Sequence, residues 1–184
     1  MRSVCVFCGS SPGFDSIYLE TAALLGRTLA QRELTLVYGG AQVGLMGLLA
    51  DAALAAGGAV IGVIPRFLRT REVAHEGLTR LEVVETFAER KERMATLADA
   101  FLSLPGGIGT LDELFETLSW SQVGLQRKPN ALLNVAGFYD ALVAHLDRAA
   151  RDGYIRAPHR ALLTIGSEPA PLLDALHEAA VRQA

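Results

Sequence analysis

The chain has 184 residues but contains only two lysines, two cysteines and four histidines. No apolar segment approaches the roughly 18 residues that a membrane-spanning helix needs. The formal net charge of -3 at pH 7 gives no reason to expect a broad nucleic-acid-binding surface. We therefore expect a soluble, cytoplasmic protein that binds neither membranes nor nucleic acids.

The few cysteines and histidines do not form a metal site. Cys5 and Cys8 are spaced as C-x-x-C, but both lie in a run that is typical of a β-strand. Residues three apart on a strand face opposite sides of the sheet, so the two sulfurs should not meet. The histidines are scattered, without the spacing of metal ligands. We expect no metal and no cofactor.

What is present is a pattern of short apolar runs that alternate with longer helical patterns. Strands are predicted at 3–8, 34–38, 59–64, 80–84, 100–104, 130–135 and 161–165. Helices are predicted at about 15–31, 43–57, 86–98, 111–124, 138–152 and 169–182. This alternation predicts a single domain, 1–184, with an α/β architecture: a mostly parallel sheet of about seven strands between two layers of helices.

Glycine-rich turns follow three of the predicted strands: "CGSSPG" (8–13), "YGGAQVGLMG" (38–47) and "PGGIGT" (105–110). None has the lysine of a P-loop, and none contains the G-x-G-x-x-G of a dinucleotide site. Each still lets backbone amides approach an anion at the start of a helix. Three such turns in one small sheet predict a nucleotide or sugar-phosphate site that includes Gly9, Ser10, Gly39 and Gly40. Ser10 either caps the first helix or contacts the ligand.

Two charged residues stand out beside these turns. Arg90 lies in an apolar helical stripe with Phe87 and Met94, so its side chain either extends to solvent or meets a buried anion. Glu113 forms a capping-box pattern with Thr110, which predicts Thr110 as the N-cap of the following helix. A carboxylate at Glu113 would also face the sugar of a bound nucleotide, and the helix dipole should keep it ionised.

At this point the chain resembles a known family. "PGGIGTLDE" (105–113) is similar to the P-G-G-x-G-T-x-x-E signature of the Lonely Guy (LOG) family of cytokinin riboside 5'-monophosphate phosphoribohydrolases. "VYGGAQVGLMG", "VIGVIP" and "ERKERMATLADAFLSLPGG" occur in the family's order. The resemblance implies a Rossmann-like fold and hydrolysis of the N-glycosidic bond of an N6-substituted AMP, which gives the free base and ribose 5-phosphate.

The resemblance also implies roles for individual residues. Arg90 and Glu113 match the catalytic pair, and Lys91 and Glu72 match substrate contacts. Four residues of the third glycine turn match the 5'-phosphate site: Gly106, Gly107, Gly109 and Thr110. Ile108, between them, is expected among the substrate-binding residues. The chain departs from the family at Ile108, which replaces a common tyrosine, and at Phe87, which replaces a methionine. These differences affect the preference for a base more than the reaction.

Two other functions are compatible with the same features. One is a general AMP nucleosidase, which differs only in its base pocket. The other is a non-catalytic carrier of a nucleotide or of the molybdenum cofactor, which would gain little from a carboxylate beside its bound anion. A homodimer is also expected, both from the resemblance and because apolar residues occupy more than one face of the helix after the third turn: Leu118, Trp120, Val123 and Leu125.

Overall fold

The computed structural model describes residues 1–69 and 74–183. All seven predicted strands are present, with ends that differ from the prediction by at most two residues. The strands are β1 (Ser3–Phe7), β2 (Thr35–Tyr38), β3 (Val60–Pro65), β4 (Arg80–Val84), β5 (Ala100–Ser103), β6 (Asn130–Leu133) and β7 (Leu163–Gly166).

The six predicted helices are also present. They are α1 (Ser16–Gln31), α2 (Gly44–Ala55), α3 (Phe87–Leu97), α4 (Ile108–Gln122), α5 (Asp140–Arg151) and α7 (Pro169–Gln183). Two short elements were not predicted, the 3-10 turn η1 (Val135–Gly137) and the four-residue helix α6 (Ala157–Arg160). Both are too short to give a helical periodicity in the sequence.

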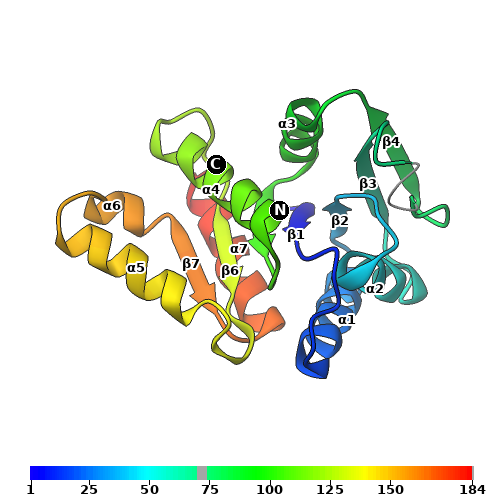
Figure 1. Cartoon of the computed structure of the whole chain (residues 1–184), viewed down its shortest axis with the longest axis horizontal. Helices are drawn as coiled ribbons and strands as arrows, with labels where there is room; N and C mark the ends of the chain where they lie inside the picture. Colours follow the sequence, from blue (N-terminus) through cyan, green and yellow to red (C-terminus); the bar gives the residue numbers. More distant parts are fainter. Residues whose placement is uncertain (70–73, 184) are drawn as a thin grey trace.

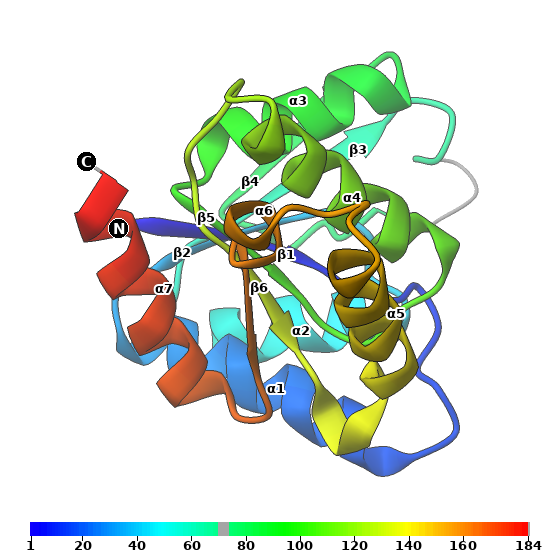
Figure 2. The same cartoon turned by 90° about the vertical axis from the view of Figure 1, so that its left-hand side faces the viewer.

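The seven strands form one sheet in the order β4-β3-β2-β1-β5-β6-β7, and every pair is parallel. Helices α1, α2 and α7 cover one face, whereas α3, α4 and α5 cover the other, as Figures 1 and 2 show. The three-layer α/β/α prediction is therefore confirmed. The sheet is wholly parallel rather than mostly parallel.

Apolar side chains pack on both faces of the sheet. The largest cluster lies between the sheet and α1, α2 and α7, and it includes Cys8. Cys5 belongs to a second cluster on the other face, under α3. Both thiols are free and buried, so the prediction that the two sulfurs do not meet is correct.

The strand order reverses at the centre of the sheet. From β1 the chain moves outward to β2, β3 and β4, and it then returns to β5 on the other side of β1. In open parallel sheets, ligands bind outside the carboxyl ends of the strands at such a reversal. The turns after β1, β2 and β5 are three of the segments that meet there.

Within the described residues, no helix has the length and apolar character needed to cross a membrane. The predicted contact Glu72 lies outside the described residues. The structure describes the long connection between β3 and β4 on both sides of residues 70–73, and Leu68 of this connection lines the cavity described below.

Candidate active site

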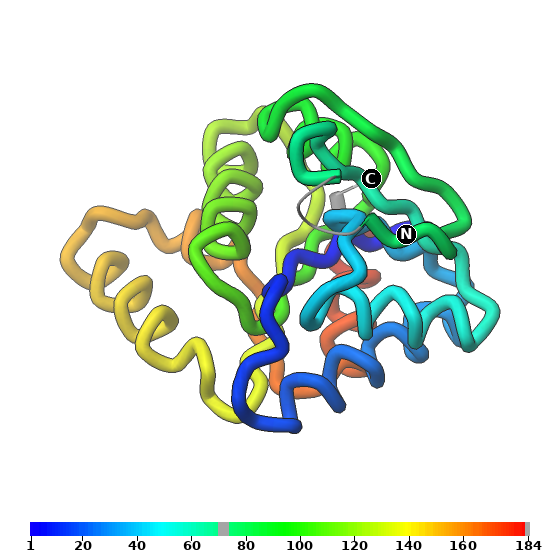
Figure 3. Tube along the Cα trace, turned by 45° about the vertical axis from the view of Figure 1, so that its right-hand side comes forward, coloured from blue at the N-terminus to red at the C-terminus, as the bar shows by residue number. Residues whose placement is uncertain are grey.

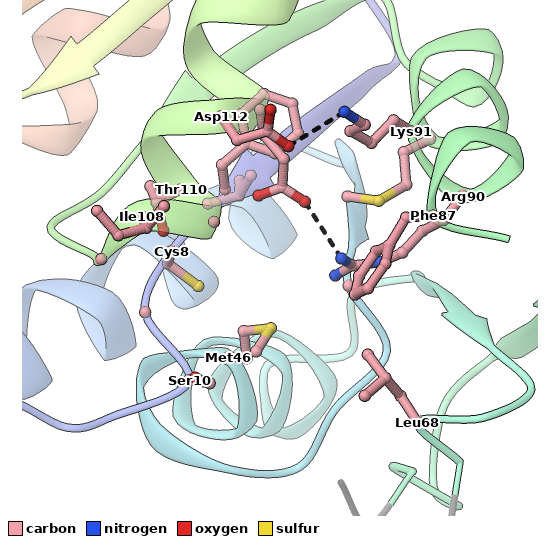
Figure 4. A pocket seen from close by; sticks show the side chains of 18 residues that line it. Cys8, Ser10, Met46, Leu68, Phe87, Arg90, Lys91, Ile108, Thr110 and Asp112 are labelled. Carbon is pink, nitrogen blue, oxygen red and sulfur yellow. Dashed lines mark hydrogen bonds and ion pairs between the residues drawn. The ribbon is translucent and has the colours of Figure 1, made fainter.

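A cavity of about 270 Å³ opens at the carboxyl ends of the central strands (Figure 4). The turns after β1, β2 and β5 form part of its wall, and the rest comes from α3, the start of α4, the end of β1 and Leu68 of the β3–β4 connection. Of the residues expected at the site, the cavity is lined by Gly9, Ser10, Gly39, Arg90, Lys91, Gly107, Ile108, Gly109, Thr110 and Glu113. Segments that are up to 104 residues apart in the chain thus share one site.

Backbone hydrogen bonds connect the three glycine turns. The N–H of Gly9 donates to the carbonyl of Pro105 at 3.1 Å, and the N–H of Leu45 donates to the carbonyl of Gly9 at 3.1 Å. The Cα trace shows the segments after β1 and β2 running beside each other (Figure 3). The turn after β1 is therefore fixed between the other two.

Close backbone approach explains the glycine at position 106. A Cβ there would lie 2.1 Å from Oγ1 of Thr110 and 2.9 Å from the nitrogen of Gly9. Gly106 thus supports the cavity wall from behind and does not line the cavity. Gly40 also lies behind the wall, where its carbonyl accepts a hydrogen bond from the N–H of His75 at 3.0 Å. Gly40 and Gly106, which were predicted to contact the ligand, therefore lie behind the cavity wall and allow close packing of the backbone there.

The first residues of α4 face the cavity with open space before them. The helix begins at Ile108, with Gly107 as its N-cap, so the prediction of Thr110 as the N-cap is wrong. Thr110 lies inside the first turn because its side chain packs on the Cα of Gly106. A Cβ on Gly107 or Gly109 would meet nothing within 4 Å. The free N–H groups of a helix N-terminus and this space form a place for an anion.

Arg90 projects from α3 into the centre of the cavity. Its guanidinium donates from Nε to the carbonyl of Val63 at 3.1 Å and lies 5.8 Å from the centre of the Phe87 ring. A Cβ on Gly39 would lie 2.0 Å from Nη2 of Arg90, so the glycine leaves the space that the guanidinium fills. The side chain is 13% exposed. Of the two predicted arrangements, a buried position beside an anion is the one observed.

That anion is Glu113. Its Oε1 lies 3.4 Å from Nη1 of Arg90, although the buried Oε1 accepts no hydrogen bond from the described residues. Glu113 is the sixth residue of α4, and because the helix starts at Ile108, it does not form the predicted capping box. The ion pair joins the middle of α3 to the first turns of α4, across the cavity.

Burial raises the pKa of Glu113 to about 7, and the carboxylates of Asp112 and Glu116 add to this effect while Arg90 and Lys91 oppose it. The expectation that the helix dipole keeps this group fully ionised is therefore wrong. A carboxyl group with a pKa near neutrality can accept or donate a proton at physiological pH. This shift marks Glu113 as a candidate catalytic group.

Lys91 lies beside Arg90, but its ammonium is engaged by α4. Nζ lies 3.1 Å from Oδ2 of Asp112 and 3.0 Å from Oε1 of Glu116. Burial lowers the pKa of Lys91, but the hydrogen bonds to these two carboxylates outweigh it and leave the pKa raised. Lys91 therefore remains a cation.

Some of the remaining residues that line the cavity were expected from the sequence, and others were not. Asp15 caps α1, and Ser10 lines the cavity instead. The lining residues Met46, Leu68 and Asp112 were not singled out, because an apolar residue or a surface carboxylate has no signature of its own. Ile108 is 83% exposed at the edge of the cavity.

Comparison with known proteins identifies the family of the chain. A family model described as "Possible lysine decarboxylase" matches residues 46–176. The cytokinin riboside 5'-monophosphate phosphoribohydrolase of Rhodococcoides fascians is 49% identical over 165 residues, which cover 89% of this chain and 83% of that protein. A probable enzyme of the same name from Oryza sativa subsp. japonica is 45% identical over 177 residues, which cover 96% of this chain and 72% of the relative.

Solved structures share the fold at lower sequence identity. The molybdenum cofactor binding protein of Rippkaea orientalis superposes with a TM-score of 0.73 at 22% identity over 97% of both chains. The DNA processing protein A of Helicobacter pylori superposes with a TM-score of 0.60 at 15% identity, over 96% of this chain and 80% of that chain. These proteins have different functions, so the likeness shows the fold alone.

The description "lysine decarboxylase" does not fit the lysines of this chain. A pyridoxal phosphate enzyme needs a lysine for its Schiff base. Lys91 is paired with two carboxylates, and Nζ of Lys128 donates to the carbonyl of Ala95 at 2.6 Å, so neither ammonium is free. The glycine signature, the Arg90–Glu113 pair and the identity to named relatives agree: the chain belongs to the Lonely Guy (LOG) family, the family of the cytokinin riboside 5'-monophosphate phosphoribohydrolases.

Proposed function

We propose that this protein hydrolyses the N-glycosidic bond of an N6-substituted AMP and releases the free base and ribose 5-phosphate. The observation that carries the proposal is the buried Arg90–Glu113 pair, 3.4 Å apart, in a cavity that also contains a helix N-terminus. Relatives at 45–49% identity bear the name of this activity. A nucleotide suits the cavity because the helix N-terminus can bind its phosphate, the charged pair can contact its ribose and the apolar side chains can contact its base.

The 5'-phosphate binds at the start of α4. The N–H groups of Ile108, Gly109 and Thr110 belong to the first turn, which has no partners within the helix. The positive end of the helix dipole favours a dianion there. Binding energy from the phosphate, which takes no part in the bond cleavage, then holds the ribose in a reactive position.

The ribose C1' lies near Glu113 in this arrangement. Hydrolysis forms a bond from C1' to a water oxygen and breaks the C1'–N9 bond, whose electron pair leaves with the base. Positive charge develops on the ribose, as in glycoside hydrolysis, where carboxylates stabilise the cation and activate water. Glu113 performs this role, accepting the water proton, and Arg90 orients the ribose or the phosphate. The departing base takes up a proton.

Met46, Leu68 and Phe87 give the cavity an apolar part, opposite α4 (Figure 4). An adenine base with an apolar N6 substituent suits this surface better than a second charged group. A general AMP nucleosidase would use the same Arg90–Glu113 pair, so only the relative rates for the two substrates separate these functions.

The test is incubation of the protein with isopentenyladenosine 5'-monophosphate, AMP and the unphosphorylated riboside, followed by chromatography for free base. We expect release from the first substrate, slower release from AMP, and release from the riboside at least about 100-fold slower. Equal rates for the riboside and its monophosphate would contradict the phosphate site. Nucleotide binding without any base release would favour the carrier.

We also propose that the protein is a homodimer. Large apolar side chains remain exposed on and after α4: Ile108, Phe115, Val123 and Leu125. A second copy of the chain could cover this surface, since exposed apolar groups of this kind commonly mark an interface. Light scattering at micromolar concentration should give twice the mass of one chain, and a mass of 19.6 kDa would refute the dimer.

A further inference from the structure

Lys91 occupies an unusual position among the charged groups of the cavity. Its neighbour on α3, Arg90, meets Glu113, whereas Lys91 meets Asp112 and Glu116 on either side of Glu113 along α4. Two cations of α3 thus bind three carboxylates of α4. Two dashed lines in Figure 4 mark the Lys91–Asp112 and Arg90–Glu113 pairs between the helices.

The apolar packing of the two helices does not supply a link of this kind. Met94 of α3 belongs to the cluster with Cys5, Phe7 and Phe101, whereas Leu114 of α4 belongs to a different cluster under α5. Helix α3 packs on β1 to β4, and helix α4 packs on β1, β5 and β6. Both helices thus rest on β1, and the charged side chains that cross the cavity add direct contacts that fix the distance between the helices at this point.

The ammonium of Lys91 is well placed to set this distance. Its side chain is 18% exposed, and that of Glu116 is 28% exposed, so both groups of this pair are partly withdrawn from water. Ion pairs of partly buried groups are screened by salt less than exposed pairs are. The contacts at 3.1 Å and 3.0 Å hold Nζ between the carboxylates of Asp112 and Glu116.

We propose that Lys91 is a positioning residue: it clamps α4 to α3 through Asp112 and Glu116 and so fixes Arg90 and Glu113 at their working separation. This inference rests on the proposed function, because it assigns Lys91 a part in the same reaction. It differs from the substrate contact that the family resemblance implies, in which the ammonium binds the nucleotide itself.

The two roles make opposite predictions for the carboxylates. If Lys91 acts through Asp112 and Glu116, their replacement by Asn and Gln removes the clamp and lowers kcat. If Lys91 binds the phosphate, the same replacement frees the ammonium and removes negative charge near the dianion, so KM falls. A double-mutant cycle between Lys91 and the carboxylates therefore separates the roles.

The experiment compares Lys91→Met, the Asp112→Asn/Glu116→Gln pair and the combined triple variant, with isopentenyladenosine 5'-monophosphate as substrate. Arg90, Lys91, Asp112, Glu116 and the Cys8 thiol all face Glu113, and the changes of charge shift its titration. The rates are therefore compared on the high-pH plateau of each variant's own pH profile. We expect kcat to fall about tenfold in each variant and no further in the triple variant, with KM changed less than about threefold, since a small displacement of catalytic groups acts on turnover.

Two further variants serve as controls. Lys91→Arg keeps the charge and the reach to both carboxylates, so we expect it to restore most of kcat. Arg93→Ala removes another ion pair of α3, with Glu82 of β4 at 2.6 Å, which lies outside the cavity. It should leave kcat within about twofold of the wild type if only the links to α4 position the active groups.

A rise of KM by about tenfold or more in Lys91→Met, with the full effect retained when the carboxylates are replaced, would overturn the clamp in favour of direct substrate binding. The melting temperature gives a second reading that needs no catalysis. If the clamp exists, Lys91→Met lowers Tm when it is introduced into the wild-type chain but not when it is introduced into the Asp112→Asn/Glu116→Gln variant. Independent effects on Tm would refute it, whereas absent base release by the wild type would refute the proposed function.

Discussion

The wall of the cavity formed by the three strand-end turns is made of backbone, whereas the wall formed by α3 and α4 carries charged side chains. In the first wall, glycines allow segments to approach within distances that a Cβ would not permit. In the second wall, Arg90 and Glu113 meet across 23 positions of the sequence. The first wall therefore contributes mainly to binding, whereas the second wall contains the group that titrates and the Arg90 cation, which serves both binding and turnover.

The largest effect should come from the charged wall. Glu113→Gln keeps the shape of the side chain but cannot accept a proton or offset the charge of a ribosyl cation. We expect kcat to fall about 10²–10⁴-fold. AMP affinity should persist or increase, because a negative neighbour of the phosphate is lost. Isothermal titration with AMP and an assay of base release measure both quantities.

Arg90→Ala is the matched contrast to Glu113→Gln. It removes a cation from the cavity, so nucleotide affinity should weaken together with turnover. Normal base release by Glu113→Gln would show that the carboxylate has no catalytic part and would favour the carrier function instead.

The pH dependence of stability tests the charged wall alone, because Glu113, the group that titrates near neutral pH, belongs to that wall. With a pKa of about 7, Glu113 holds a proton in the folded state between about pH 4.5 and 7, where the unfolded chain has lost it. The contribution to stability is complete below pH 4.5 and decreases as the pH rises to 7, by about 3 kcal/mol in total. Urea unfolding of the wild type and Glu113→Gln across pH 4–9 should show this difference.

Activity should change with pH in the opposite direction. If the carboxylate form is the active one, kcat/KM increases about tenfold per pH unit up to pH 7 and is constant above it. A decrease above pH 7 would instead assign Glu113 the role of general acid for the departing base. A profile without an inflection near pH 7 would contradict both roles.

Two neighbouring glycines test the backbone wall. In Gly106→Ala, the new Cβ would lie 2.1 Å from Oγ1 of Thr110 and 2.9 Å from the nitrogen of Gly9. We expect a loss of about 1–3 kcal/mol in the free energy of unfolding, as for an overpacked core. Gly107→Ala meets no atom within 4 Å, so it should cost only about 0.5–1 kcal/mol, because Ala is a poorer N-cap than Gly.

The same Gly107→Ala variant should nevertheless bind AMP more weakly, since the methyl group enters the space before the helix N-terminus. Its binding of the unphosphorylated riboside should be unchanged. If both alanine variants lose stability equally, the close approach at Gly106 does not explain the sequence of the turn.

The smallest effect on activity is expected at Tyr139, a side chain that supports the backbone wall from behind. Its hydroxyl donates to the carbonyl of Leu104 at 2.7 Å, immediately before the third turn. Tyr139→Phe should reduce stability by about 1 kcal/mol and raise KM a few fold at constant kcat. A change in kcat with constant KM would show that the two walls are not independent.

Some parts of the site follow from local sequence signals. The glycine turns were recognisable because each follows a strand and precedes a helix, and parallel strands bring such turns to one edge. Arg90 was recognisable because a charge in an apolar stripe needs a partner. The residue pattern alone did not identify this partner, since the capping-box pattern of Thr110 and Glu113 gave a sufficient local reason for the carboxylate. Only the family resemblance placed Arg90 and Glu113 together as a catalytic pair.

The start of α4 shows why local patterns can mislead. Thr110 has the residue type of an N-cap, yet the helix begins at Ile108 because the turn at Gly106 packs against Gly9 and leaves room for the Thr110 side chain. Gly9 is 97 positions from Gly106, so no window of the sequence contains this contact. The partners of Lys91, which lie 21 and 25 positions away, were not predicted for the same reason.

The sequence by itself determined the alternation of strands and helices, the parallel sheet, the three glycine turns and the family, because these depend on residue type and short spacing. Only the tertiary structure decided which charges meet, how deeply Glu113 is buried and hence its pKa near 7, and that Lys91 is held by α4. Burial and charge pairing are sums over neighbours from distant segments. They are set when β1, β2 and β5 come together, and no single segment carries them.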